Sequence, residues 1–224
     1  MNWPALALTF RLAGLVSLLL LVLGLPIAYW LTFSRWRFKF LVEAVVALPL
    51  VLPPTVLGFY VLVALGSRSP IGRVYQELFG SPLPFTFEGL VVASVLYSLP
   101  FAVQPFASAF AAVDPRLLAA AATLGASRWR TFLRVVLPLS AAGVITGVVL
   151  SFAHTVGEFG VVLMVGGNIP GITRTASIAV YDDVQALDYA SAAQLSLTLL
   201  VFSFLVLALV YGTNPRTRSR WRLR

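Results

Sequence analysis

Five stretches of this sequence run for more than twenty residues with almost no charge, and they limit the possible fold more than any other feature. They cover about residues 10–33, 44–66, 89–112, 136–158 and 191–212. A transmembrane helix needs about 20 apolar residues. Charged residues make up 11% of the chain, against roughly 25% in soluble domains. The sequence therefore predicts an all-α integral membrane protein in which residues 1–224 form one domain with about five transmembrane helices.

Two segments complete this prediction. The N-terminus has no basic residue before Arg11, and the apolar run that follows is too long for a signal peptide, so it is interpreted as the first span. Residues 159–173 are also uncharged, but they include Gly166, Gly167, Pro170 and Gly171, which favours a broken or re-entrant piece over a sixth crossing.

The distribution of Lys and Arg predicts the orientation, because cytoplasmic loops of membrane proteins are enriched in both. Twelve of the sixteen follow the first, third and fifth spans. This bias predicts five crossings of the inner (plasma) membrane, with the N-terminus outside and the C-terminus in the cytoplasm. The five arginines of the C-terminal tail (Arg216, Arg218, Arg220, Arg222 and Arg224) are interpreted as a topology anchor. Binding of lipid headgroups or nucleic acid by this tail is the alternative, although the apolar runs leave little basic surface for nucleic acid.

The cytoplasmic loop at residues 113–135 reads as a helical hairpin. Asp114-Pro115 is a helix start, since Asp caps free amides and Pro fits the first helical position. Alanines continue the helix and Gly125 ends it. Ser127 can cap a second helix, on which the spacing predicts one inward apolar face. That face comprises Trp129, Phe132, Leu133 and Val136. We expect a rigid helical projection, with Arg130 and Arg134 on another face, rather than a simple connecting loop.

The alanines, Gly125 and Leu137-Pro138 resemble the "EAA" loop of permeases from binding-protein-dependent ABC transporters. Segments 47–66 (ALPLVLPPTVLGFYVLVALG) and 157–175 (GEFGVVLMVGGNIPGITRT) are similar to the molybdate branch, with sulfate and tungstate permeases as relatives. The resemblance covers nearly the whole chain and implies a type I ABC importer permease fold. The family's usual glutamate aligns with Ala119, so any salt bridge from that acid is absent here.

The resemblance implies a function in ATP-driven import of molybdate. In the family, the loop docks as a coupling helix into a groove on the ATPase subunit. The implied partners are two copies of that ATPase and an extracytoplasmic molybdate-binding protein. Because five spans are few for a pathway, we expect a homodimer with the pore on its two-fold axis. The candidate docking residues are Asp114, Ala119, Ala120, Gly125, Ala126, Ser127, Arg128, Trp129, Arg130 and Phe132.

The residue types argue against chemistry within this chain. A phosphate-binding loop needs Gly-Lys-Ser/Thr, and the only lysine, Lys39, has no glycine near it. There is no cysteine and only one histidine, so we expect no metal site, no cofactor and no enzyme activity. His154 is interpreted as a structural hydrogen-bonding residue.

Candidate pathway residues are polar groups and helix breakers within the spans. Glu158, flanked by Gly157 and Gly160, is interpreted either as a gate or as an acid at a helix end in the interface. Prolines are expected to break the second and third spans, at Pro100 and Pro105 in the third, although kinks also serve packing. The candidate pathway residues are Pro49, Pro53, Pro54, Thr55, Gln104, Gly157, Glu158 and Asn168.

Three alternatives stay open. Within the class, the substrate could be sulfate or tungstate. From another class, the chain could be a channel or membrane scaffold without ATP coupling, against which the hairpin argues. A membrane enzyme is the weakest alternative.

Gly143 and Gly147 allow close helix contact, either within one subunit or across a dimer.

Overall fold

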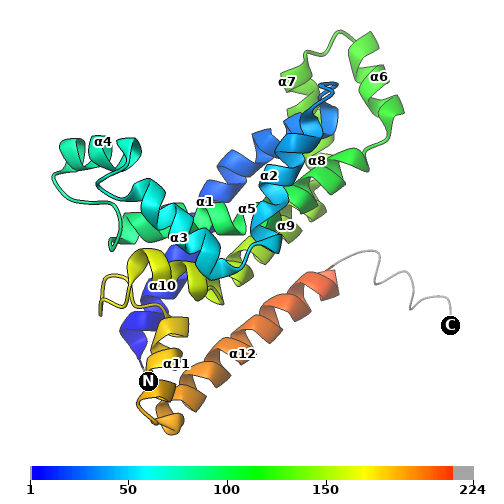
Figure 1. Cartoon of the computed structure of the whole chain (residues 1–224). Helices are drawn as coiled ribbons and strands as arrows, with labels where there is room; N and C mark the ends of the chain where they lie inside the picture. The colour runs from blue at the N-terminus through cyan, green and yellow to red at the C-terminus, as the bar shows by residue number, and fades with distance from the viewer. Residues whose placement is uncertain (1, 214–224) are drawn as a thin grey trace.

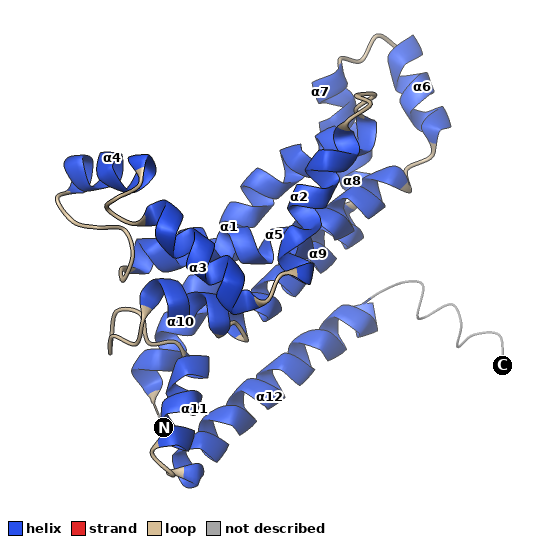
Figure 2. Cartoon of the chain, viewed as in Figure 1, coloured by secondary structure: helices blue, strands red, loops and turns tan. Residues whose placement is uncertain are grey.

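The computed structural model describes residues 2–213, and over that range the chain folds entirely into helices and loops (Figure 2). This confirms the all-α prediction for the described residues. The arginines of the C-terminal tail lie outside them. In chain order the helices are α1 (Trp3–Phe33), α2 (Lys39–Val51), α3 (Pro54–Leu65), α4 (Pro70–Phe79), α5 (Phe87–Ala111), α6 (Pro115–Thr123), α7 (Arg128–Thr131), the π-helix η1 (Phe132–Val136), α8 (Leu137–Leu139), α9 (Ala141–Val156), α10 (Gly160–Gly166), α11 (Ala176–Gln185) and α12 (Tyr189–Thr213).

Three helices, α1, α5 and α12, are each long and apolar enough to cross a membrane. Two bent pairs bring the number to five if each pair is one span. One is α2 with α3, which meet at 116° where Pro53 and Pro54 interrupt the chain. The other is residues 128–139 with α9, which meet at 75°. The expected fourth span at 136–158 therefore has its first residues in the bent segment before Ser140, whose Oγ donates to the Ala109 carbonyl oxygen at 3.1 Å.

The first helix begins earlier than expected. It starts at Trp3, where the Asn2 side chain accepts a hydrogen bond from the Ala5 amide at 3.2 Å. Arg11 lies within this helix, and its guanidinium carbon sits 4.5 Å from the centre of the Phe87 ring. A cation over an aromatic face is stabilised there. The charge of Arg11, which lies at the start of the predicted span, is therefore accommodated within α1.

The third span contradicts the expectation that its prolines break it. Pro100 and Pro105 both lie inside α5, which runs without interruption from Phe87 to Ala111. Packing explains the difference, because α1 and α9 flank α5 and enclose large side chains between them. Phe106 and Phe110 are fully buried there. Such packing offsets the backbone hydrogen bonds that the prolines remove.

Gly143 and Gly147 make their close contact within one subunit. A Cβ atom at Gly143 would collide with Ala109 Cβ, and one at Gly147 would lie 2.6 Å from Phe106 Cε1, so both glycines bring α9 onto α5. This settles the question that the sequence left open. Small residues let two helices approach closely where lipid supplies no hydrophobic driving force.

Replacing Gly147 by Leu is expected to destabilise the folded chain, because the new side chain would displace Phe106. Overpacking of this kind costs about 1–3 kcal/mol, so the unfolding temperature in detergent should fall. Gly14→Leu is the matched control, since a Cβ at Gly14 meets nothing within 4 Å. Equal unfolding temperatures for the two variants would contradict the packing role of Gly147.

The last long helix packs loosely on the bundle. Its Phe202 ring lies 4.8 Å from that of Phe10 on α1 and 6.0 Å from that of Phe152 on α9, and Figure 1 shows the end of α12 beyond this leaning away from α5 and α9. Only 11% of its most apolar window is buried, and its near end packs against α11. Asp188 caps this end by accepting a hydrogen bond from the Ser191 amide at 3.1 Å. Hydrogen bonds from Ser191 also lower the pKa of the Asp188 carboxyl below its usual range.

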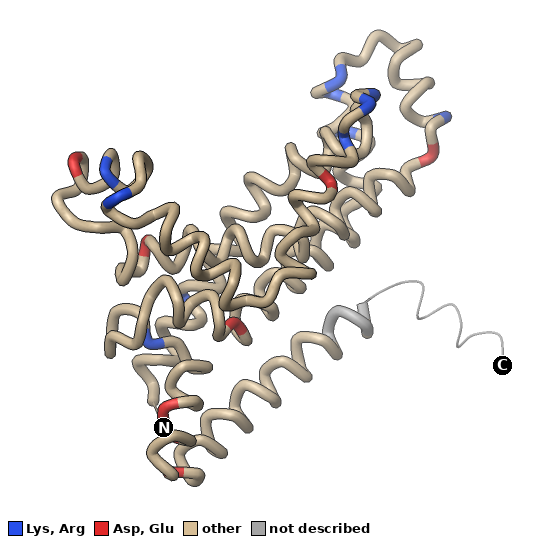
Figure 3. The backbone as a smooth tube through the Cα atoms, viewed as in Figure 1, with Lys and Arg blue, Asp and Glu red and all other residues tan. Residues whose placement is uncertain are grey.

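The molecule has two distinct ends. The N-terminus lies with α4, α10 and α11 at one end, and the α1–α2 loop lies with α6 and α7 at the other (Figure 1). Figure 3 shows a group of Lys and Arg residues at the α6–α7 end and a smaller group on α4.

Candidate functional site

A hairpin of two short helices projects from the α6–α7 end of the bundle (Figure 1). Its first helix begins as predicted, with Asp114 accepting a hydrogen bond from the Arg116 amide at 2.8 Å. None of the residues in α6 is buried, and Leu124 at its end is 86% exposed. The first helix therefore presents its surface, including Ala119 and Ala120, to whatever lies outside the chain.

The corner of the hairpin is a glycine turn of the kind predicted. Gly125 has φ +74°. Its amide donates to the Ala122 carbonyl at 3.0 Å, and the Ala126 amide donates to the Ala121 carbonyl at 3.0 Å. This pair of bonds is the Schellman motif, which needs a left-handed residue after the helix. The turn fixes the angle between the two helices, and only glycine takes this conformation without strain.

The second helix starts at the expected cap but turns differently. The Ser127 hydroxyl accepts a hydrogen bond from the Arg130 amide at 3.3 Å. The expected inward face of four residues is wrong, because Trp129 is 68% exposed and Leu133 is 42% exposed. The π-helix η1 follows at once, and its wider turn changes which side chains point inward.

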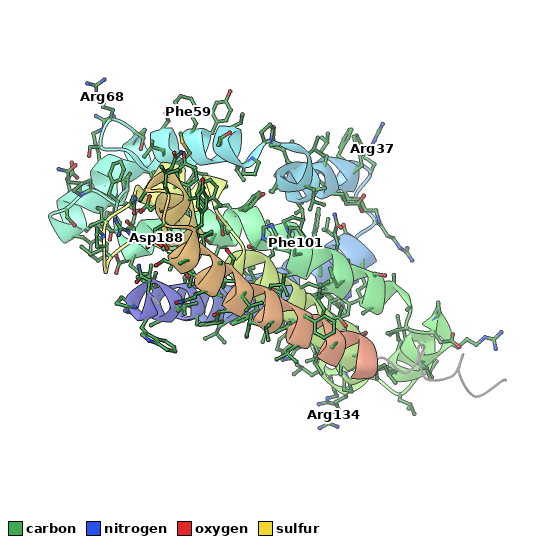
Figure 4. The ribbon with its side chains drawn as sticks, turned by 90° about the horizontal axis from the view of Figure 1, so that it is seen from below. Arg37, Phe59, Arg68, Phe101, Arg134 and Asp188 are labelled. Carbon is green, nitrogen blue, oxygen red and sulfur yellow. The ribbon has the colours of Figure 1, made fainter. Side chains whose placement is uncertain are left out.

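Phe132 attaches the second helix of the hairpin to the bundle, and half-buried Leu118 of α6 packs against the same core. Phe132 is 7% exposed, and its ring centre lies 5.0 Å from that of Tyr29 and 5.7 Å from that of Phe110, both edge-on. Arg128, Trp129 and Arg130 remain on the surface. The predicted docking residues thus divide into one buried anchor and an exposed apolar and basic surface. Figure 4 shows Arg134 projecting from the same end.

A second candidate site is an open cavity of about 560 Å³ toward the other end, where α3, α9 and α10 meet α5. Four of the predicted pathway residues line it, namely Pro54, Thr55, Gly157 and Glu158. Pro54, Thr55 and Gly157 are exposed. The broken second span and the end of the fourth are therefore brought together here. Gly160 permits this approach, since a Cβ on it would lie 2.8 Å from Pro54 Cβ.

Glu158 is buried in the wall of this cavity, with 3% of its surface exposed. It follows the end of α9 at Val156, and its carbonyl oxygen accepts a hydrogen bond from the Ser177 hydroxyl of α11. Neither carboxylate oxygen has a hydrogen-bond partner among the described residues, and the same is true of the buried Ser94 hydroxyl. An acid at a helix end would face water at the interface, so the burial of Glu158 disagrees with that interpretation.

His154 lies beside this cavity in a hydrogen-bonded cluster. Its Nδ1 is 2.9 Å from the Ser98 hydroxyl, which is 2.9 Å from the Thr155 hydroxyl. The Phe101 ring stacks on the imidazole with centres 3.8 Å apart. These contacts confirm the structural interpretation of His154. Ser98 and Tyr97 were missed from the sequence, because serines and tyrosines within an apolar helix give no sign of which neighbour they will meet.

The other four predicted pathway residues lie elsewhere. Pro49 is buried within α2, and Pro53 is exposed at the α2–α3 break. Gln104 lines a separate cavity of about 460 Å³ with Lys39 and Glu43.

Asn168 belongs to an exposed polar cluster in the loop after α10. Its Nδ2 donates to the two Asp182 carboxylate oxygens at 2.9 and 2.7 Å. Its Oδ1 accepts from Arg174 Nε at 2.6 Å. Asn168 therefore ties the loop to α11 and does not line the Glu158 cavity.

Residues 21–219 match the family described as "Binding-protein-dependent transport system inner membrane component". The chain belongs to this family. The family description and the long apolar helices together indicate a multi-pass protein of the inner membrane.

Several relatives of this permease carry a transport function in their names. A molybdenum transport system permease protein from Azotobacter vinelandii is 57% identical, over 94% of this chain and 93% of the relative. One from Escherichia coli K12 is 40% identical, over 82% and 80%. A probable sulfate transport system permease protein from Chlorella vulgaris is 32% identical, over 92% and 77%.

Solved structures confirm the expected type I ABC importer permease fold. A chain of the inward-facing MetNI methionine ABC transporter matches with a TM-score of 0.74 at 15% identity, covering 94% of this chain and 93% of that one. A chain of a bacterial alginate ABC transporter matches with a TM-score of 0.71 at 17% identity, covering 95% and 78%. At these identities the likeness concerns the fold alone.

Proposed function

We propose that this permease forms the translocation pathway of an ATP-driven molybdate importer. The observation that carries the proposal is the 57% identity to a molybdenum permease over nearly the full length of both chains. Among the described residues, no lysine or arginine lines the Glu158 cavity. A dianion would therefore find no fixed charge to hold it there. Selectivity then rests on a separate extracytoplasmic binding protein, and the permease supplies passage.

Energy enters through the hairpin. Two copies of a separate ATPase dock on the exposed surface of α6 and α7, one on each permease subunit. This surface combines Leu124 and Trp129, both more than half exposed, with the charge of Arg130, which is exposed outside the groove beside α1. A short helix laid into a groove is a common recognition arrangement. Phe132 transmits the movement of the docked hairpin to α1 and α5, which it contacts directly.

The pathway lies on the two-fold axis of a homodimer. The exposed residues Thr55 and Gly157 at the mouth of the Glu158 cavity face the partner subunit, so two half-cavities form one chamber. The gate is the segment around Glu158, where the bent second and fourth spans meet. A C2 dimer uses the same surface of both subunits, which suits a pathway that one subunit with five crossings does not enclose.

The hairpin end is cytoplasmic in this proposal, and the N-terminus and α4 are periplasmic. Paired phosphatase and fluorescent-protein fusions measure both positions. After Arg224 the fluorescent protein should be active and the phosphatase inactive, as expected in the cytoplasm. Within residues 67–81 the phosphatase should be active and the fluorescent protein inactive, as expected in the periplasm. A periplasmic result for the C-terminal fusion would overturn the five-span topology.

The deciding experiment is uptake of labelled molybdate, tungstate and sulfate in a strain that depends on this permease for all three. We expect molybdate uptake that requires the ATPase and binding-protein genes. Sulfate is the second candidate, because a sulfate permease is 32% identical over 92% of this chain. Preferential sulfate uptake would replace the molybdate assignment while leaving the permease function in place.

A channel or scaffold without ATP coupling is the alternative from another class. It would retain neither ATPase on purification nor ATP dependence of uptake. The proposal requires both.

A further inference from the structure

A groove of about 710 Å³ separates the end of α1 from the hairpin. Its walls are apolar, with Tyr29, Phe33, Leu118 and Ala122 among them. Two arginines, Arg35 and Arg128, also line it, together with the hydroxyl groups of Ser34 and Thr131. A groove with apolar walls and a cationic rim complements an amphiphile with an anionic head.

The two arginines have no acidic partner in the part of the chain that the structure describes. Its salt bridges are Lys39–Glu43 and Arg174–Asp182. Arg35 and Arg128 are both exposed at the rim of the groove. Arg35 follows α1, and Arg128 is the first residue of α7. Their positive charge is therefore available to an anion from outside the chain.

The segment beside the groove has the composition of a membrane boundary. From Arg35, in the α1–α2 loop, to Phe40, at the start of α2, basic and aromatic residues alternate (RWRFKF). Ring centres of Trp30 and Trp36 are 5.8 Å apart, and those of Trp36 and Phe38 are also 5.8 Å apart. Figure 4 shows Arg37 projecting outward from the molecule. Tryptophan and basic residues gather where a membrane meets the cytoplasm, so this loop marks that boundary.

We propose that the groove between α1 and the hairpin binds one anionic glycerophospholipid, with its phosphate against Arg35 and Arg128 and its acyl chains along the apolar walls. The bound lipid bridges a transmembrane helix and the otherwise unburied α6. It therefore supports the hairpin from the side that faces the bilayer. The proposal depends on the membrane placement and not on the transported anion or on the ATPase.

The test uses the purified full-length permease in detergent and counts bound lipid by native mass spectrometry. Phosphatidylglycerol and phosphatidylcholine with identical acyl chains are titrated together. We expect the wild type to retain phosphatidylglycerol selectively. Arg35→Gln and Arg128→Gln should each lower its affinity about fivefold, since a basic residue near an anionic lipid surface contributes roughly that factor. Arg68→Gln and Arg73→Gln, the same single change in charge at the α4 end, should each leave it unchanged.

Two further measurements separate a lipid from a free anion. Ala122→Phe fills an exposed position on the apolar wall without altering charge, and it should also lower phosphatidylglycerol retention. Glycerophosphoglycerol or inorganic phosphate, at ionic strength matched with chloride, should not displace the lipid. Displacement by either one would identify a free-anion site and overturn the proposal. Wild-type retention by the Arg35→Gln/Arg128→Gln double variant, with circular dichroism unchanged, would overturn it as well.

Discussion

Gly125→Val is expected to abolish most ATP-driven uptake while leaving the permease folded in the membrane. Position 125 has φ +74°, a conformation in which an L-residue is strained by roughly 1–2 kcal/mol and a β-branched residue by more. Nothing in α6 is buried, and an isolated helix of its length is marginal in water. The Schellman turn is therefore a large part of what holds the first helix of the hairpin in place.

The expected loss of ATPase affinity is about tenfold or greater, because a strain above 1.4 kcal/mol changes an equilibrium by that factor. Co-purification of the ATPase and anion uptake in vesicles measure the effect. Gly80→Val is the matched control, since Gly80 ends α4 with φ +75° and lies at the opposite end of the molecule. If Gly125→Val binds ATPase and transports as well as Gly80→Val, the hairpin corner has no role in docking.

Local chemistry is what the sequence predicts well in this chain. Asp114, Gly125 and Ser127 act on backbone groups within a few residues, so their caps and turn follow from residue type alone. The prediction of an inward apolar face on the second helix was wrong for a related reason. An α-helical spacing was applied to residues 132–136, which form a π-helix, and no residue type marks that change of turn.

Tertiary packing is what the sequence left undetermined. Two prolines predicted a broken third span, yet α5 continues through them because α1 and α9 pack on either side. Asn168 and Glu158 belong to the same glycine-containing segment of the sequence, yet the fold places them in different environments. Asn168 binds Asp182 on the surface, whereas Glu158 is buried beside α5. Only the approach of α3 to α10 brings Thr55 and Glu158 to one cavity.

Glu158→Gln is expected to change the ratio of ATP hydrolysis to anion uptake by about tenfold while leaving insertion and ATPase binding intact. The reason is the unsatisfied carboxylate. In the described structure neither oxygen accepts a hydrogen bond, although a buried unpaired carboxylate is costly. The conformation in which this group gains a donor, from Ser94 nearby or from the partner subunit, is then favoured by the charge. A hydrogen bond to a charged group is worth about 1.5–3 kcal/mol.

Glutamine keeps the shape of the side chain but cannot ionise, so the two conformations of the proposed gate would no longer differ by the free energy of a hydrogen bond to a charged group. ATP hydrolysis and labelled molybdate uptake, measured together in vesicles with and without binding protein, report the ratio. Glu88→Gln is the control, because Glu88 is exposed at the start of α5 and its charge is already solvated. If Glu158 belongs to a gate, the substitution should change ATP hydrolysis in the absence of binding protein. If Glu158 is purely structural, that hydrolysis should stay unchanged. Wild-type values in both assays for Glu158→Gln would therefore remove Glu158 from the pathway and leave it as a buried residue that only joins α9 to α11.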